Sequence, residues 1–101
     1  MRQDFRGTGG AVRFASGPIV RIEEWAIVID AGNRLWSGEL TVHAFVGDLP
    51  YDHDPATVTL VDQRHGSVIL TGKVVLTSRR LVTEMSTRCQ VQGMEAPKMY
   101  P

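Results

Sequence analysis

The chain is poor in cysteine and has no long apolar run, and each shortage excludes a class of protein. A single cysteine, Cys89, cannot form an internal disulfide. That argues against a disulfide-stapled secreted scaffold and is compatible with a reducing compartment. The longest apolar-rich run, Trp25–Ile29, is far shorter than the roughly 20 residues that a membrane-spanning helix requires. The polar N-terminus carries no signal-peptide pattern, so we expect no membrane partner.

The chain also lacks an excess of either charge. Lysine and arginine together number 11, and aspartate and glutamate together number 11. A nucleic-acid-binding protein normally carries a positive surface, so we expect no specific nucleic-acid binding. What is present is typical of one globular domain: 101 residues, of which 43% are hydrophobic. Little self-repulsion also favours close packing between copies of the chain.

β-strand signals dominate the middle of the sequence. Segments rich in Val, Ile, Leu and Thr alternate with turn signals such as Gly17-Pro18 and Ala31-Gly32-Asn33. The clearest period-two pattern covers residues 83–91. We expect six strands, at residues 11–15, 19–30, 35–46, 57–61, 67–78 and 83–91. The fold class predicted is therefore all-β, with about six antiparallel strands in a small sandwich or barrel.

The domain is expected to span residues 11–93, between two flexible arms. Residues 1–10 are polar and end in glycines, and residues 94–101 are closed by prolines. Chain ends are usually disordered unless another part of the structure orders them. A neighbouring subunit is one way to order them.

Several residues carry local expectations. The alternation slips near Glu23-Glu24-Trp25, which indicates a β-bulge. Gly72, inside a strand, indicates a bulge or a close backbone approach. Trp25 and Trp36 are expected in the core, with exposed contact anchors as the alternative. Cys89 lies in line with other apolar residues, which favours a buried filler over a nucleophile paired with His43 or His65.

The loop at residues 47–55 contains the most suggestive polar cluster. Asp52, His53 and Asp54, with Asp48 nearby, are of the types that bind metals. They are weak metal candidates, because no metal-ligand spacing supports them and aspartates commonly cap turns in solvated loops. A metal-dependent enzyme that uses these three residues is one hypothesis. The favoured expectation is a protein without catalytic residues or cofactor, because no catalytic pair has supporting context.

Residues in the arms, in the loop and after the strand at 67–78 are candidates for contacts between subunits. Arg79 and Arg80, with Arg88, form either a small basic patch, a solvated edge or an intersubunit ion-pair site. The interface candidates are Phe5, Arg6, Asp48, Tyr51, Arg79, Arg80 and Tyr100.

A family resemblance comes from the C-terminal half of the chain. Residues 66–78 form a glycine-led strand that ends in Thr-Ser, and residues 85–93 form a strand that ends in Gln-x-Gly. Together they resemble the closing hairpin of bacteriophage tail-tube-type proteins. The segment 22–27, Ile-Glu-Glu-Trp-Ala-Ile, is similar to the first sandwich strand of that family.

The resemblance covers about half of the chain and implies a structural subunit of a phage particle, in the tail tube, neck or head decoration. It implies a homo-oligomer that also contacts other virion proteins and resides in the virion, assembled in the host cytoplasm. Family members of this kind contribute no catalytic residues. The alternative is a small β-barrel binding module for a ligand, sugar or peptide, with Trp25 or Trp36 exposed in a concave patch.

Overall fold

The computed structural model describes residues 2–32, 34–50, 54–62 and 64–100, and within them the protein is all-β. One antiparallel sheet contains every strand of the described residues. The helical structure in this part of the chain is a single 3-10 turn, η1, at Val46–Asp48. The strands are β1 (Arg2–Thr8), β2 (Gly10–Phe14), β3 (Ile19–Asp30), β4 (Trp36–Val42), β5 (Ala56–Asp62), β6 (Ser67–Thr83), β7 (Ser86–Gly93) and β8 (Lys98–Met99).

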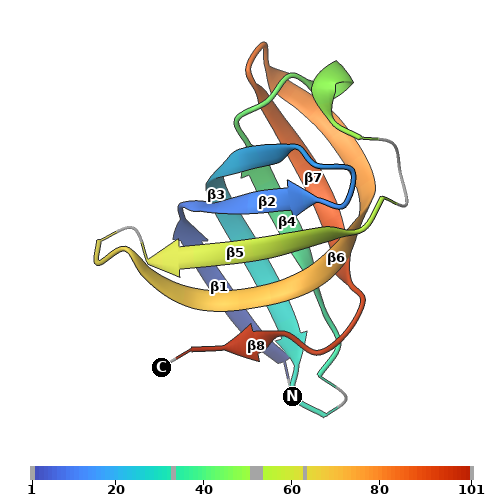
Figure 1. The fold of residues 1–101 in the computed structure, drawn as a ribbon. Coiled ribbons are helices and arrows are strands. Elements are labelled where there is room, and N and C mark those ends of the chain that lie inside the picture. Colours follow the sequence, from blue (N-terminus) through green and yellow to red (C-terminus); the bar gives the residue numbers. More distant parts are fainter. Residues whose placement is uncertain (1, 33, 51–53, 63, 101) are drawn as a thin grey trace.

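The sheet closes on itself. Hydrogen-bonded neighbours lead from β3 through β2, β5, β6, β7 and β4, and β4 pairs again with β3. Figure 1 shows β2, β5 and the first part of β6 crossing in front of a layer of β1, β3, β4 and β7, with β6 curving from one layer to the other. β1 and β2 follow one another along the same edge of β3, and β8 adds to β6. The long strands β3 and β6 therefore join both layers.

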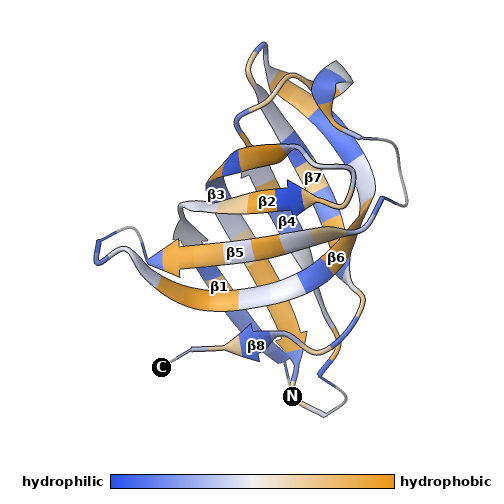
Figure 2. Ribbon diagram, in the orientation of Figure 1, coloured by the Kyte–Doolittle hydropathy of each residue, from blue (hydrophilic) through white to orange (hydrophobic). Residues whose placement is uncertain are grey.

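The core lies between the two layers. Alternate residues of β5 point inward, and hydropathy alternates along most of this strand (Figure 2). The most deeply buried large side chains come from six strands and are Val12, Ile22, Trp36, Leu40, Val42, Val58, Leu60, Leu70, Val74, Thr87 and Cys89. Trp25 and Trp36 are 5% and 2% exposed, which confirms that both belong to the core.

Local irregularities are where the sequence indicates them. The pairing of β3 with β4 shifts between Ile22 and Glu24, which confirms the β-bulge. Gly66 has a φ of 67° in the turn between β5 and β6. A Cβ atom at Gly72 would collide with the indole of Trp36, so a side chain, and not another backbone segment, lies close to this glycine.

The structure corrects the two ends of the predicted domain. Residues 2–8, expected to be part of a flexible arm, form β1 and pair with β3 over their whole length. Within the expected C-terminal arm, Lys98–Met99 forms β8 on the edge of β6. β1 was missed because it has only one large apolar residue, Phe5. Its backbone hydrogen bonds are made with β3, which lies further along the chain.

The ends of the last two long strands also differ from prediction. Arg79-Arg80 does not end its strand, because β6 continues to Thr83. The predicted strand at 83–91 begins later, at Ser86, after a turn at Glu84-Met85. Two register shifts, between Leu76 and Ser78 and between Leu81 and Thr83, break the alternation that sequence reading follows. Within the described residues the sheet thus has eight strands, where six were expected.

Candidate functional site

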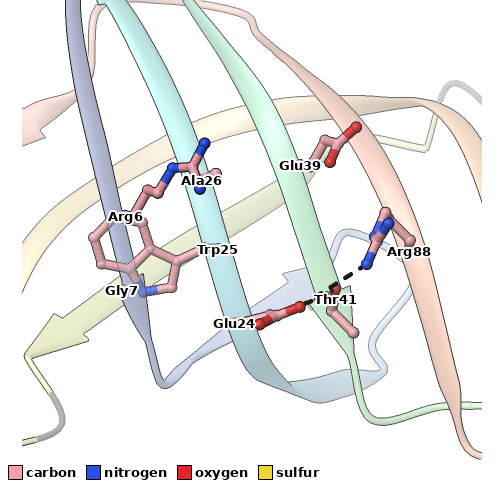
Figure 3. Close-up of a pocket in the computed structure, with 8 residues that line it drawn as sticks. All are labelled: Arg6, Gly7, Glu24, Trp25, Ala26, Glu39, Thr41 and Arg88. Carbon is pink, nitrogen blue, oxygen red and sulfur yellow. Dashed lines mark hydrogen bonds and ion pairs between the residues drawn. The ribbon is translucent and has the colours of Figure 1, made fainter.

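A shallow polar cavity of about 290 Å³ lies on the outer face of the layer formed by β1, β3, β4 and β7. Figure 3 shows its lining residues, which come from all four strands: Arg6, Gly7, Glu24, Trp25, Ala26, Glu39, Thr41 and Arg88. The pairing aligns them in two rows across the sheet. Arg6, Ala26 and Glu39 form one row. Glu24, Thr41 and Arg88 form the other.

Glu24 and Arg88 form an ion pair across strands in this cavity. Glu24 Oε1 accepts a hydrogen bond from Thr41 Oγ1 at 3.5 Å and lies 4.0 Å from Arg88 Nη2 (Figure 3). Both distances are long and the side chains are partly solvated, so each contact contributes at most about 1 kcal/mol. Two arginines and two glutamates give the cavity no excess of either charge. Its chemistry suits contact with a polar surface.

The tryptophan below the cavity has an unpaired indole N–H. Trp25 Nε1 is buried and has no hydrogen-bond partner among the described residues. Gly7 makes room for this ring, because a Cβ atom at that position would collide with the indole. Trp36 differs, since its Nε1 donates to the Glu95 carbonyl oxygen at 2.7 Å.

A second cluster joins Ser86, Glu23 and His43. Ser86 Oγ donates to Glu23 Oε1 at 2.5 Å, and His43 Nδ1 lies 3.7 Å from the same oxygen. In a nucleophilic triad the imidazole must contact the hydroxyl, because the imidazole takes its proton. Here the carboxylate lies between the other two groups. The cluster therefore links β3, β7 and the segment after β4. Its geometry does not let His43 take the proton of the Ser86 hydroxyl. Sequence reading missed it because the three residues are far apart in the chain.

Cys89 is a buried filler, as expected. Its side chain is 1% exposed among core residues. Burial raises the pKa of the Cys89 thiol to about 11, and the positive charge of Arg79 counteracts part of that rise. A thiol with so high a pKa is protonated at neutral pH and is a poor nucleophile.

The metal hypothesis receives no support from the described residues. Asp52 and His53, like Tyr51, lie outside them. Asp54 Oδ2 accepts a hydrogen bond from Ser16 Oγ at 2.8 Å, which joins this loop to the turn between β2 and β3. Within the described part of the chain, no group of three or more His, Cys, Asp and Glu side chains gathers as metal ligands would.

The predicted interface residues are spread over the surface. Phe5 and Arg6 lie on β1, and Asp48 lies in η1. Arg79 pairs in register with Cys89, whereas Arg80 pairs with Arg88, so the expected basic patch is divided between the two faces of the sheet. Tyr100 follows β8, and its N–H donates to the Ile69 carbonyl oxygen at 2.9 Å. These residues do not form one site.

Two surface features that sequence reading did not identify stand out. One is β1, which pairs only with β3 among the described strands. The other is the end of the β6–β7 hairpin, which exposes Leu81, Val82 and Met85. None of the described segments is a helix of the length and hydropathy that crossing a membrane requires.

Comparison with known proteins identifies no relative. The chain matches no protein-family model, no curated protein and no solved structure.

Proposed function

We propose that the protein is a non-enzymatic structural subunit of a bacteriophage particle, in the tail tube, neck or head decoration. It assembles with copies of itself and with other virion proteins. The observation that supports this proposal best is the unpaired edge of β1, which offers seven residues of backbone for strand addition. The resemblance of residues 66–78 and 85–93 to tail-tube hairpins is the reason for proposing a phage particle as the assembly.

The β6–β7 hairpin supports the same proposal. It carries three exposed apolar side chains at its end, Leu81, Val82 and Met85. Apolar groups gathered on a protruding element are typical of contact surfaces, because burial against a partner removes them from water. In a ring or tube, such a hairpin reaches the neighbouring subunit.

The alternative, a binding module with an exposed aromatic platform, loses its main support. It depended on Trp25 or Trp36 in a concave surface patch, and both indoles are buried. Trp25 lines the polar cavity beside Arg6 and Arg88, but at 5% exposure it leaves little of its ring for a sugar or peptide to stack on.

Electron microscopy and light scattering of the purified protein test the proposal. We expect concentration-dependent oligomers that include rings, tubes or particle-bound subunits. A protein that stays monomeric at all concentrations and never joins rings, tubes or capsids would overturn it. The matched control is a binding assay by tryptophan quenching with sugars and peptides, which we expect to be negative.

A further inference from the structure

β1 has an open edge that faces away from β3. Its register with β3 runs from Arg2 opposite Asp30 to Thr8 opposite Glu24. No strand of the described residues pairs along its other side, and just after β1 the Val61 N–H donates to the Gly9 carbonyl oxygen at 3.4 Å. At the Gly7–Thr8 end of β1, a hollow of about 420 Å³ is also lined by Val61 and Ile69 of the β5–β6 hairpin, which forms no ladder with β1.

The direction of the backbone groups at this edge follows from the β3–β4 hairpin. Asp30 donates its N–H to Leu35 and accepts from Arg34, so its polar groups face β4. Because these directions alternate along a strand, Ile29, Ile27 and Trp25 turn theirs toward β1. Their partners Gln3, Phe5 and Gly7 bond back to β3. Arg2, Asp4, Arg6 and Thr8 therefore present N–H and C=O groups at the open edge.

The side chains of β1 are complementary to those of a second, antiparallel β1. Phe5 is partly buried against the core, whereas Arg2, Asp4 and Arg6 are exposed on the outer face. If Phe5 lies opposite Phe5 of a second copy, Asp4 of each chain lies opposite Arg6 of the other. Both cross-strand pairs then join opposite charges on adjacent strands, where such pairs are favourable.

The neighbouring registers are unfavourable. A slip by two residues in one direction places Asp4 opposite Asp4 and Arg2 opposite Arg6. The opposite slip places Arg6 opposite Arg6. A slip by one residue would place the inward-facing residues of one β1 beside the outward-facing residues of the other. Among the registers in which at least five residues of β1 overlap, charge thus selects one, and in it each Asp4–Arg6 pair also exchanges two backbone hydrogen bonds.

We propose that β1 pairs with β1 of a second copy of this chain, antiparallel and two-fold symmetric about Phe5. The inference rests on the proposed function, because it names the partner and the register of the β1 edge. The resulting interface is isologous: the same strand contributes both sides, and the pairing cannot extend to a third copy. Larger assemblies then require another surface, such as the β6–β7 hairpin.

Charge exchange tests this register directly. Asp4→Arg gives a strand with arginine at positions 4 and 6, and Arg6→Asp gives one with aspartate at both. Each variant alone opposes like charges and should dimerise about tenfold more weakly than the wild type or worse. An equimolar mixture restores both ion pairs, so the heterodimer should form with near wild-type affinity. The double variant Asp4→Arg/Arg6→Asp should dimerise with itself as well.

The measurement is sedimentation velocity, or native mass spectrometry of the mixture, with circular dichroism to verify the fold. Arg13→Asp is the matched control, because Arg13 is exposed on β2, both of whose edges are paired. It should leave dimerisation unchanged. Preferential heterodimer formation supports the proposal, and equal self-association of wild type, single variants and mixture overturns it.

Cross-linking provides an independent check. Cα atoms of a hydrogen-bonded pair lie about 5.5 Å apart, within reach of a disulfide. A mixture of Asp4→Cys and Arg6→Cys should oxidise to a covalent heterodimer, whereas each variant alone should not. Cys89 is buried and does not interfere. A covalent dimer of either variant alone, with no mixed product, would contradict the register.

Failure of this inference differs from failure of the proposed function. Rings or tubes that form regardless of charge at positions 4 and 6 would refute the β1 pairing and leave the structural role intact. A charge-dependent dimer that never enters a ring, tube or particle would establish the pairing and refute the virion role.

Discussion

Trp25 and Trp36 are both core indoles, yet their N–H groups have different partners. Trp36 donates to the Glu95 carbonyl oxygen, while Trp25 Nε1 is buried without an acceptor among the described residues. A buried unpaired donor costs about 1–3 kcal/mol, and a formed hydrogen bond contributes about 1 kcal/mol. The two indoles therefore bury similar apolar surface, but burying the N–H group costs more free energy at Trp25 than at Trp36.

This difference predicts unequal effects of the same substitution. Trp36→Phe loses packing and a hydrogen bond, so it should lower the free energy of unfolding by about 2–4 kcal/mol. Trp25→Phe loses similar packing but also removes an unpaired donor, so its loss should be smaller by about 1–3 kcal/mol. Urea denaturation of the two variants measures both values. Equal losses would show that Trp25 Nε1 is satisfied.

Cys89 predicts a pH dependence. Its pKa is raised by burial to about 11, above its ordinary value of 9.0, so the folded chain holds this proton more tightly than the unfolded chain. The protonated Cys89 thiol therefore contributes to the free energy of unfolding. This contribution is complete below about pH 9 and is lost as the pH rises through about 11. The loss should reach roughly 2–3 kcal/mol.

Denaturation curves between about pH 8 and pH 11 measure this loss. Cys89→Ala is the control, since it shares every other titrating group. The variant is less stable throughout because it leaves a cavity, so the comparison is between slopes. Identical pH slopes for wild type and Cys89→Ala would contradict a thiol that is protonated in the fold.

At the scale of elements, β1 carries the clearest prediction. Phe5 packs against the core and Arg2 is exposed, although both belong to the same strand. Phe5→Ala should therefore lower the free energy of unfolding by about 1–2 kcal/mol, because only part of its ring is buried. Arg2→Ala should change it by less than about 0.5 kcal/mol. If residues 2–8 were a flexible arm in solution, both substitutions would have no effect.

The elements also show what the sequence predicts well. Strands at 19–30 and 67–78 were predictable because runs rich in β-branched residues lie between clear turn signals, and the β3–β4 hairpin followed from the turn signal at Ala31-Gly32. β1 was not, because its stability comes from pairing with a strand about twenty residues away. The end of β6 was missed for a different reason, since two bulges interrupt the alternation before Thr83.

At the scale of the whole molecule, the sequence predicted which residues form the core but not which surface is left unpaired. Trp25, Trp36 and Cys89 were placed correctly because apolar residues in register on a strand share one face. Which edge remains unpaired depends on the order of strands in the closed sheet, and that order arises from long-range pairing. Phe5 and Arg6 were named as interface candidates for the arm they were expected to form, and the structure instead places them on the unpaired edge.

The closed sheet leaves two surfaces for assembly, and they should be separable. If the β1 edge forms a two-fold dimer, growth beyond the dimer depends on another contact, for which the exposed end of the β6–β7 hairpin is suited. Leu81→Ser/Met85→Ser should abolish rings or tubes and leave the β1 dimer intact. Because both side chains are about half exposed, at 48% and 51%, the fold should lose little stability.

Ile19→Ser is the matched control for the hairpin variant. Ile19 is 60% exposed but begins β3, far along the chain from the hairpin, so its replacement should leave assembly unchanged. Electron microscopy counts the rings or tubes, and light scattering measures the dimer that remains. Assemblies that persist in Leu81→Ser/Met85→Ser but disappear in Ile19→Ser would move the second contact to the groove beside Ile19, Phe14 and Met94. Loss of the dimer in the hairpin variant would mean that the two surfaces act together, because an isologous β1 interface on its own does not depend on a distant hairpin.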